Sequence, residues 1–293
     1  MIKYFLYKFG LFILYRVPVS LSYRIARFIS SVQYALSVVD KKAVKNNLKM
    51  ILHREHELDR TAKEIFINFG RYLVEFFLTG KKVTKDFVKD NIQFENIEYL
   101  DKALKLGKGA ILVTAHVGNW ELGAIVLSLL GYPINGIALP HKEKQVNDLF
   151  NKQRSEKGIK IIPSNLAARR CLEALDRNEI VALLGERDFT NLGQPLEFFG
   201  KTTIVPRGAA VFSNKTGAPI IPVFLIRKNE ETGNSLKKFV LSFCEPIYPQ
   251  RRSGRMQKDE AIQGLMKQYL KVIENIISSN PEQWIMFREF WVK

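Results

Sequence analysis

Six short apolar runs after residue 90 restrict the possible folds of this chain more than any other feature. They occupy residues 109–115, 134–139, 158–163, 180–185, 219–227 and 239–244. Amphipathic stretches of helical length lie between most of them, at 120–130, 142–156, 164–177 and 206–216, and a last helix is expected near 257–279. Strands that alternate with helices predict an α/β domain with a largely parallel sheet flanked by helices.

Residues 1–90 have a different pattern, with apolar residues at the three-and-four spacing of helices. The first forty residues mix apolar and aromatic side chains with basic ones, namely Lys3, Lys8, Arg16, Arg24 and Arg27. Their uncharged runs are shorter than the ~20 residues of a spanning helix. This composition is typical of helices that lie in a membrane interface, although helices packed on the rest of the protein are the alternative. We therefore predict a helical membrane-interface segment at 1–90, continuous with an α/β domain at 91–293.

The charge balance indicates an anionic partner. Lysine and arginine total 45 against 29 acidic residues, which gives a net charge of +16. Nucleic acid, an anionic membrane and an acidic carrier protein would each suit this charge. The basic residues are spread along the chain, and no helix-turn-helix, RNP or finger pattern is present, so we expect no nucleic-acid partner. Cys171 and Cys244 are far apart and in no CxxC arrangement, which indicates neither a zinc site nor a disulfide framework.

The segment "VTAHVGNWEL" places His116 directly after the run at 109–115. Ligands of α/β sheets gather at the carboxyl ends of strands, so this histidine has a functional position. Five residues along a continuous helix rotate by about 140°, so His116 and Glu121 meet only if "HVGN" forms a turn. Gly118 permits an unusual backbone and Asn119 is a good N-cap for a following helix. Glu121 then lies in the first helical turn, where the helix dipole favours its ionised form.

An ionised glutamate beside an imidazole fixes its tautomer and supports the positive charge that forms when the ring takes a proton. Such a pair can activate a hydroxyl for attack on an acyl carbonyl without an enzyme nucleophile. Backbone amides at the helix start could hold a phosphate or an oxyanion. The alternative is a chance pairing of two ordinary residues. Other chemistries lack their motifs, because the chain has no GxSxG, GxxxxGK[ST], GxGxxG, HExxH or EF-hand pattern.

The stretch "AHVGNWELG" resembles the H-x4-D/E motif of the glycerolipid acyltransferase superfamily, in the form typical of the bacterial lipid A biosynthesis (lauroyl/myristoyl) acyltransferases. The resemblance covers most of the chain and extends to "NDLFNKQRSEKGIKII", "ALDRNEIVALLGERDF", "EFFGKTTIVPRGAAVFSNKTGAPIIPVF" and "PEQWIMFRE". It implies that His116 is the general base and Glu121 its partner, and that Arg154 and Asp188 line the active-site cleft. The residues expected to bind substrate are Gly118, Asn119, Arg154, Arg187, Asp188 and Arg207.

Two departures from the family pattern leave the acceptor open. The family's acidic triplet is commonly D-x-D, whereas the triplet here begins with Glu186. The C-terminal "WIMFREF" lacks the second tryptophan and the histidine that often occur there. A lipid A precursor, another glycolipid and a lysophospholipid are all compatible acceptors.

The resemblance implies an acyltransferase at the cytoplasmic face of the inner membrane, peripheral or monotopic. It would move a fatty acyl group from an acyl carrier protein or coenzyme A thioester to a lipid hydroxyl, with no metal or prosthetic group. Two other functions remain open: a lipid-binding membrane protein without catalysis, and a hydrolase that uses the same residues on water.

Overall fold

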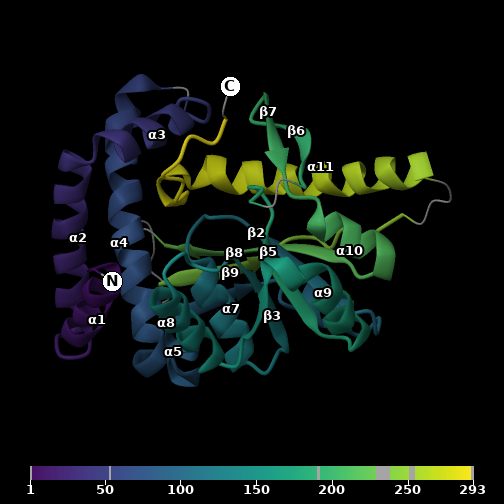
Figure 1. Cartoon of the computed structure of the whole chain (residues 1–293), viewed down its shortest axis with the longest axis horizontal. Helices are drawn as coiled ribbons and strands as arrows, with labels where there is room; N and C mark the ends of the chain where they lie inside the picture. Colours follow the sequence, from purple (N-terminus) through teal and green to yellow (C-terminus); the bar gives the residue numbers. More distant parts are fainter. Residues whose placement is uncertain (1, 53, 190–191, 229–237, 251–254, 292–293) are drawn as a thin grey trace.

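A seven-stranded sheet forms the centre of the molecule in the computed structural model, which describes residues 2–52, 54–189, 192–228, 238–250 and 255–291 (Figure 1). Its strands are β1 (Ile92–Glu95), β2 (Ala110–Thr114), β3 (Ile134–Ala138), β4 (Lys160–Pro163), β5 (Ile180–Leu184), β8 (Ile220–Arg227) and β9 (Phe239–Phe243). Their spatial order is β1-β9-β8-β2-β5-β3-β4. Strands β8, β2, β5, β3 and β4 are mutually parallel, and β9 is antiparallel to β8. The predicted α/β class and largely parallel sheet are confirmed.

Helices cover both faces of this sheet. They are α5 (Lys85–Asn91), α6 (Glu98–Leu104), α7 (Trp120–Leu129), α8 (Lys144–Ser155), α9 (Ala167–Asp176), α10 (Gly208–Thr216) and α11 (Arg255–Ser279). A separate hairpin of β6 (Gln194–Phe198) and β7 (Lys201–Val205) joins β5 to α10. Figure 1 shows α11 lying across one side of the sheet, where Tyr269 and Ile273 are fully buried.

Strand β2 shows why the sequence forms a sheet covered on both faces. All of its residues are apolar except Thr114. Ile111 and Val113 pack into the core beneath α9, α10 and α11, and Ala110 and Leu112 pack into the core beneath α6 and α7. Successive side chains of a strand point to opposite faces, so a continuous apolar run is buried on both of them.

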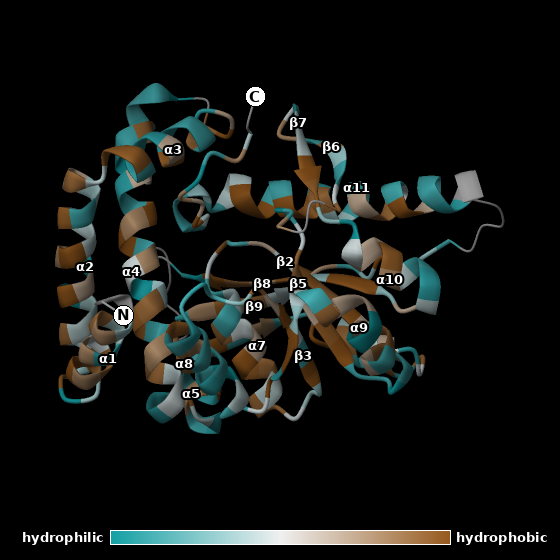
Figure 2. Ribbon diagram, viewed as in Figure 1, coloured by the Kyte–Doolittle hydropathy of each residue, from teal (hydrophilic) through white to brown (hydrophobic). Residues whose placement is uncertain are grey.

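The N-terminal region is helical, as predicted. It contains α1 (Ile2–Leu14), α2 (Val19–Leu36), α3 (Val38–Leu48) and α4 (Leu58–Lys82), and α2 packs along α4 (Figure 1). The outer sides of α1 and α2 expose apolar side chains, which include Phe5, Leu6, Phe9, Phe12, Phe28, Ile29 and Leu36. Figure 2 shows hydrophobic residues along the outside of α2. Among the described residues, no helix combines the length and the apolar content that a bilayer span requires.

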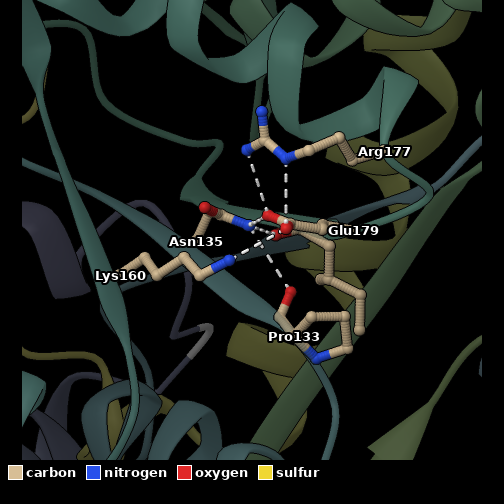
Figure 3. Close-up of polar contacts among 6 residues, drawn as sticks. Pro133, Asn135, Lys160, Arg177 and Glu179 are labelled. Atoms are coloured by element: carbon tan, nitrogen blue, oxygen red, sulfur yellow. Dashed lines mark hydrogen bonds and ion pairs between the residues drawn. The ribbon is translucent and has the colours of Figure 1, made fainter.

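A polar cluster closes the amino-terminal end of the sheet. Glu179, directly before β5, accepts hydrogen bonds from Lys160 Nζ (2.8 Å), Arg177 Nε (3.2 Å) and Asn135 Nδ2 (2.9 Å), as Figure 3 shows. Burial acts to raise the pKa of Glu179, but these donors outweigh burial and lower the pKa to about 2. The carboxylate therefore stays ionised and joins β3, β4 and β5 at this edge.

Candidate active site

His116 lies at the opposite edge of the sheet, just beyond the carboxyl end of β2. Strand β2 pairs in parallel with β5, and Thr114 is opposite Leu184. Two residues beyond Thr114 and Leu184, His116 lies beside Glu186. The parallel register therefore brings together two residues that are 70 positions apart in sequence.

Glu186 is the carboxylate that holds the imidazole of His116. His116 Nδ1 lies 2.5 Å from Glu186 Oε1, and the backbone N–H of His116 donates to the same oxygen at 2.8 Å. A carboxylate accepts hydrogen bonds and donates none, so Nδ1 carries a proton, and in the neutral form of the ring Nε2 holds the lone pair. Trp120 and Phe189 place their rings edge-on to the imidazole, at 5.0 and 6.2 Å between centroids. This geometry suits a general base.

The carboxylate of Glu186 is fully buried, and hydrogen bonds from the described residues satisfy only one of its two oxygens. Burial acts to raise the pKa of Glu186, but the charge of His116 and the hydrogen bonds from its ring and backbone outweigh burial and lower the pKa. The second oxygen, Oε2, has no hydrogen-bond partner among the described residues. A buried unsatisfied oxygen costs free energy, and such costs concentrate at functional sites.

The expected contact between His116 and Glu121 is wrong, because Glu121 binds Arg154 instead. Arg154 Nε donates to Glu121 Oε2 at 2.9 Å and Nη2 donates to Oε1 at 2.5 Å. Burial acts to lower the pKa of Arg154, but the charge and hydrogen bonds of Glu121 raise it. No hydrogen bond among the described residues joins His116 to Glu121. The physical reason is that α7 begins at Trp120, which directs Glu121 towards α8. A role for Glu121 in the reaction stays a prediction.

The predicted turn between β2 and α7 is present, and Gly118 and Asn119 form it. Gly118 has φ +64°, and a Cβ at this position would overlap the carbonyl oxygen of Leu225. Asn119 caps α7, since its Oδ1 accepts from Leu122 N–H at 3.0 Å. The backbone N–H groups of Gly118 and Asn119 donate to Gln283 O and Leu225 O, so neither remains for a ligand. Contact of these two residues with substrate stays a prediction.

The C-terminal tail holds the same turn from the other side. Ile285 N–H donates to His116 O at 2.7 Å, and Val117 forms a β-bridge with Trp284. The Gln283 side chain exchanges two hydrogen bonds with the backbone of Arg227, both 3.0 Å long. Residues 283–285 thus complete the backbone around His116.

The other predicted site residues lie in two places. Arg187 is half-buried and shares the neighbour Phe189 with His116: its guanidinium lies 4.7 Å from the Phe189 ring centroid and its Nη1 3.4 Å from Met286 Sδ. Burial and the positive charge of Arg288 lower the pKa of Arg187, and no described carboxylate lies within ion-pair distance of it. Asp188 accepts from Gly193 N–H at 3.0 Å.

Arg207 lies apart from this group. Its guanidinium pairs with Asp259 of α11 at 3.3 Å. Within the described part of the chain, no hydrogen bond or ion pair joins it to the residues around His116. A role for Arg207 in substrate binding stays a prediction.

Sequence reasoning missed Glu186 as a site residue. Its signal was its position, because Glu186 follows the strand at 180–184 by the same two residues that separate His116 from β2. Equal offsets after two apolar runs indicate a shared sheet edge, but only if the two strands are neighbours.

These features define an α/β protein with a histidine–carboxylate pair at the carboxyl edge of a parallel sheet, a site suited to acid–base chemistry. The sequence profile of the bacterial lipid A biosynthesis acyltransferases matches residues 1–293. The chain belongs to this family.

Individual relatives carry two different names. The chain is 29% identical over 163 residues to a phosphatidylinositol mannoside acyltransferase of Mycobacterium tuberculosis, covering 53% of this chain and 51% of that one. Identity to the protein of the same name from Mycolicibacterium smegmatis is 26% over 201 residues, or 67% and 61% of the two chains. A lipid A biosynthesis acyltransferase of Haemophilus influenzae is 22% identical over 203 residues, or 69% and 59%. The matches thus span between half and two thirds of these relatives.

Proposed function

We propose that this protein transfers a fatty acyl group from a thioester donor to a hydroxyl of a membrane lipid or glycolipid, with His116 as the general base. The hydrogen bond between His116 Nδ1 and Glu186 Oε1 carries this proposal. It leaves Nε2 as the basic atom in a partly exposed ring at a ligand-binding edge of the sheet. Membership of the acyltransferase family supports the same reaction.

The reaction requires one base and no enzyme nucleophile. His116 Nε2 takes the proton of the acceptor hydroxyl while the hydroxyl oxygen attacks the thioester carbonyl carbon. Glu186 stabilises the imidazolium that forms. The C–S bond of the tetrahedral intermediate then breaks, and the imidazolium returns its proton to the leaving thiolate. The products are an ester and a free thiol of acyl carrier protein or coenzyme A.

Arg187 is suited to an anionic group of the donor or the acceptor. Its guanidinium feels the positive charge of Arg288 and lacks a carboxylate partner among the described residues. Arginine recognises phosphate and carboxylate groups through paired hydrogen bonds. Two of the relatives are named for a phosphatidylinositol mannoside and for lipid A, so we propose a glycolipid acceptor.

The outer faces of α1 and α2 are proposed to bind the membrane, at its cytoplasmic side. Phe9 is 63% exposed and Phe28 is 70% exposed, and Lys8, Arg24 and Arg27 are interspersed among such residues. Contiguous exposed apolar surface with basic residues is typical of helices in a membrane interface. Phe9→Ser together with Phe28→Ser should reduce binding to vesicles that contain phosphatidylglycerol, as measured by sedimentation. Unchanged binding would contradict this assignment.

The test of the reaction uses purified protein, acyl carrier protein and coenzyme A thioesters and a total lipid extract. Mass spectrometry should reveal a defined lipid with one added acyl chain. His116→Ala should abolish that product, while His56→Ala, which changes an exposed histidine far from the site in sequence, should leave it unchanged.

Other outcomes would identify the alternatives. Release of free fatty acid without any acylated lipid would indicate a hydrolase. Intact thioesters together with retained lipid binding would indicate a lipid-binding protein without catalysis.

A further inference from the structure

Glu75 is a buried carboxylate that the reaction above does not use. It lies on α4, is 6% exposed, and contacts side chains from three other parts of the chain. Its Oε2 accepts from Asn119 Nδ2 at 2.6 Å, and its Oε1 accepts from the Tyr23 hydroxyl at 3.2 Å and forms an ion pair with Arg227. Burying a charge is costly unless it is paired, so this carboxylate needs its partners.

The contact with Asn119 fixes the orientation of that side chain. The amide of Asn119 has an oxygen that caps α7 and a nitrogen that donates to Glu75. A flipped amide would place its nitrogen against Leu122 N–H, where two donors would meet and the cap would be lost. Glu75 prevents the flip because a carboxylate accepts only from the amide nitrogen.

Asn119 in turn fixes the segment that carries His116. Only Val117 and Gly118 separate the two residues, and both are held in place, Val117 by its bridge to Trp284 and Gly118 by its hydrogen bond to Gln283 O. A turn this short and tightly held transmits a displacement of Asn119 to the imidazole. A shift of about 1 Å in a reacting group can cost on the order of 100-fold in rate.

We propose that Glu75 is a positioning residue for His116, which acts by orienting Asn119 and the turn between β2 and α7. This inference rests on the proposed role of His116 as the base. The competing explanation is that Glu75 only neutralises Arg227, in which case its contact with Asn119 has no effect on the reaction.

Three variants separate these explanations. Glu75→Gln puts an amide opposite the amide of Asn119, and Asn119→Asp puts a carboxylate opposite Glu75. In the double variant, the introduced glutamine donates to the introduced aspartate, so the hydrogen bond is restored with its direction reversed. Aspartate caps a helix as well as asparagine does. The cluster keeps its total charge in the double variant.

Each single variant should lower kcat about tenfold or more, with KM for the thioester unchanged within about twofold, because positioning acts on the transition state. The double variant should recover to within about threefold of wild type. If the double variant is as slow as the slower single variant, the contact with Asn119 is not what matters and the proposal is overturned.

Two control variants exclude a general loss of stability. Glu64→Gln makes the same chemical change on α4 at a residue whose side chain has no hydrogen bond or ion pair to any described residue. Ile65→Val removes a buried methylene from α4 and should lower Tm without lowering kcat. If kcat of Glu75→Gln falls only in proportion to Tm, as for Ile65→Val, the proposal also fails.

Nitrogen-15 NMR of the imidazole distinguishes this failure from a failure of the proposed reaction. The His116 signals are assigned by their absence in His116→Ala. They should shift in both single variants and return in the double variant, whether or not the wild type transfers an acyl group. A wild type without transfer but with this pattern would reject the proposed reaction and retain the positioning role. Unshifted signals would reject the positioning role.

Discussion

Strand β5 has a glutamate at each end, and the two carboxylates have opposite surroundings. Glu179, at the amino end, is bound by Lys160, Arg177 and Asn135, and the two cations are more than half exposed (Figure 3). Glu186, at the carboxyl end, is fully buried, binds only His116, and leaves one oxygen unsatisfied among the described residues.

The difference suits the two ends of one strand to different roles, stability at the amino end and the proposed chemistry at the carboxyl end. At the amino end, the carboxylate of Glu179 is paired with side chains of the protein. These pairs stabilise the sheet and leave few carboxylate lone pairs for a ligand. At the carboxyl end, the carboxylate directs its interactions to one reactive side chain whose other nitrogen is free of such a partner among the described residues. The variants below test this contrast.

The largest expected effect is the loss of catalysis in Glu186→Gln. The glutamine has no charge to stabilise the imidazolium, so kcat for acyl transfer should fall about 10³-fold. The matched change at the other end, Glu179→Gln, should leave kcat unchanged. Equal activities in both variants would show that Glu186 is not the partner of the base.

Replacing a glycine should cost more stability at the carboxyl end of β2 than at its amino end. Gly118→Ala forces a Cβ into the carbonyl of Leu225 at a positive φ, and should lower the free energy of unfolding by about 3 kcal/mol. Gly107, before β2, also has a positive φ, but a Cβ there meets no atom within 4 Å. Gly107→Ala should therefore cost only about 1 kcal/mol. Denaturant unfolding measures both values, and equal costs would contradict the close approach at Gly118.

Glu121→Gln distinguishes the role of Glu121 from that of Glu186 at the carboxyl edge of the sheet. It leaves the guanidinium of Arg154 without its counter-charge in a mostly buried site, and should lower the free energy of unfolding by about 2 kcal/mol. Its kcat should fall less than about tenfold, because Glu121 does not bind the imidazole. A loss of kcat as large as that of Glu186→Gln would instead restore the sequence-based pairing of His116 with Glu121.

The smallest expected effect is the pH-dependent stability that Glu179 provides. Glu179→Gln should lower the free energy of unfolding by about 1 kcal/mol at pH 7. The pKa of Glu179 is about 2 in the folded protein, below its ordinary value of 4.5. A lowered pKa stabilises the fold above pH 4.5, and this contribution disappears as the pH falls towards 2. The Tm difference between wild type and variant should shrink over that interval, and a constant difference would contradict the ion pairs in Figure 3.

The sequence predicted the interior of the fold better than its periphery. The six apolar runs became strands β2, β3, β4, β5, β8 and β9, because short apolar runs bounded by turn residues suit strands of a sheet that is covered on both faces. Strand β1 and the hairpin β6–β7 were not predicted. Their sequences, "IQFE", "QPLEF" and "KTTIV", include polar residues and a proline, and much of their surface is exposed.

The sequence predicted the parts of the site that depend on neighbouring residues, and missed the contacts between residues that are far apart in the chain. The turn at Gly118 and the cap at Asn119 follow from the residues themselves. The partners of His116 and Glu121 lie 70 and 33 residues away, and only the order of strands and helices brings them together. The tail residues Gln283 and Ile285 bind His116 and Gly118 through backbone groups, which no side-chain pattern reveals.

The hydrogen bond from Ile285 to His116 also makes the site depend on a residue that is synthesised after every strand of the sheet. All of the strands described above precede this residue in the chain, so the sheet can assemble while translation continues. The backbone around the histidine is completed only after Ile285 has emerged from the ribosome. A polypeptide that stops before that point would contain every side chain of the proposed base and its partners, yet would lack the segment that holds them. The proposed reactivity would thus depend on a segment that follows every strand of the sheet in the chain.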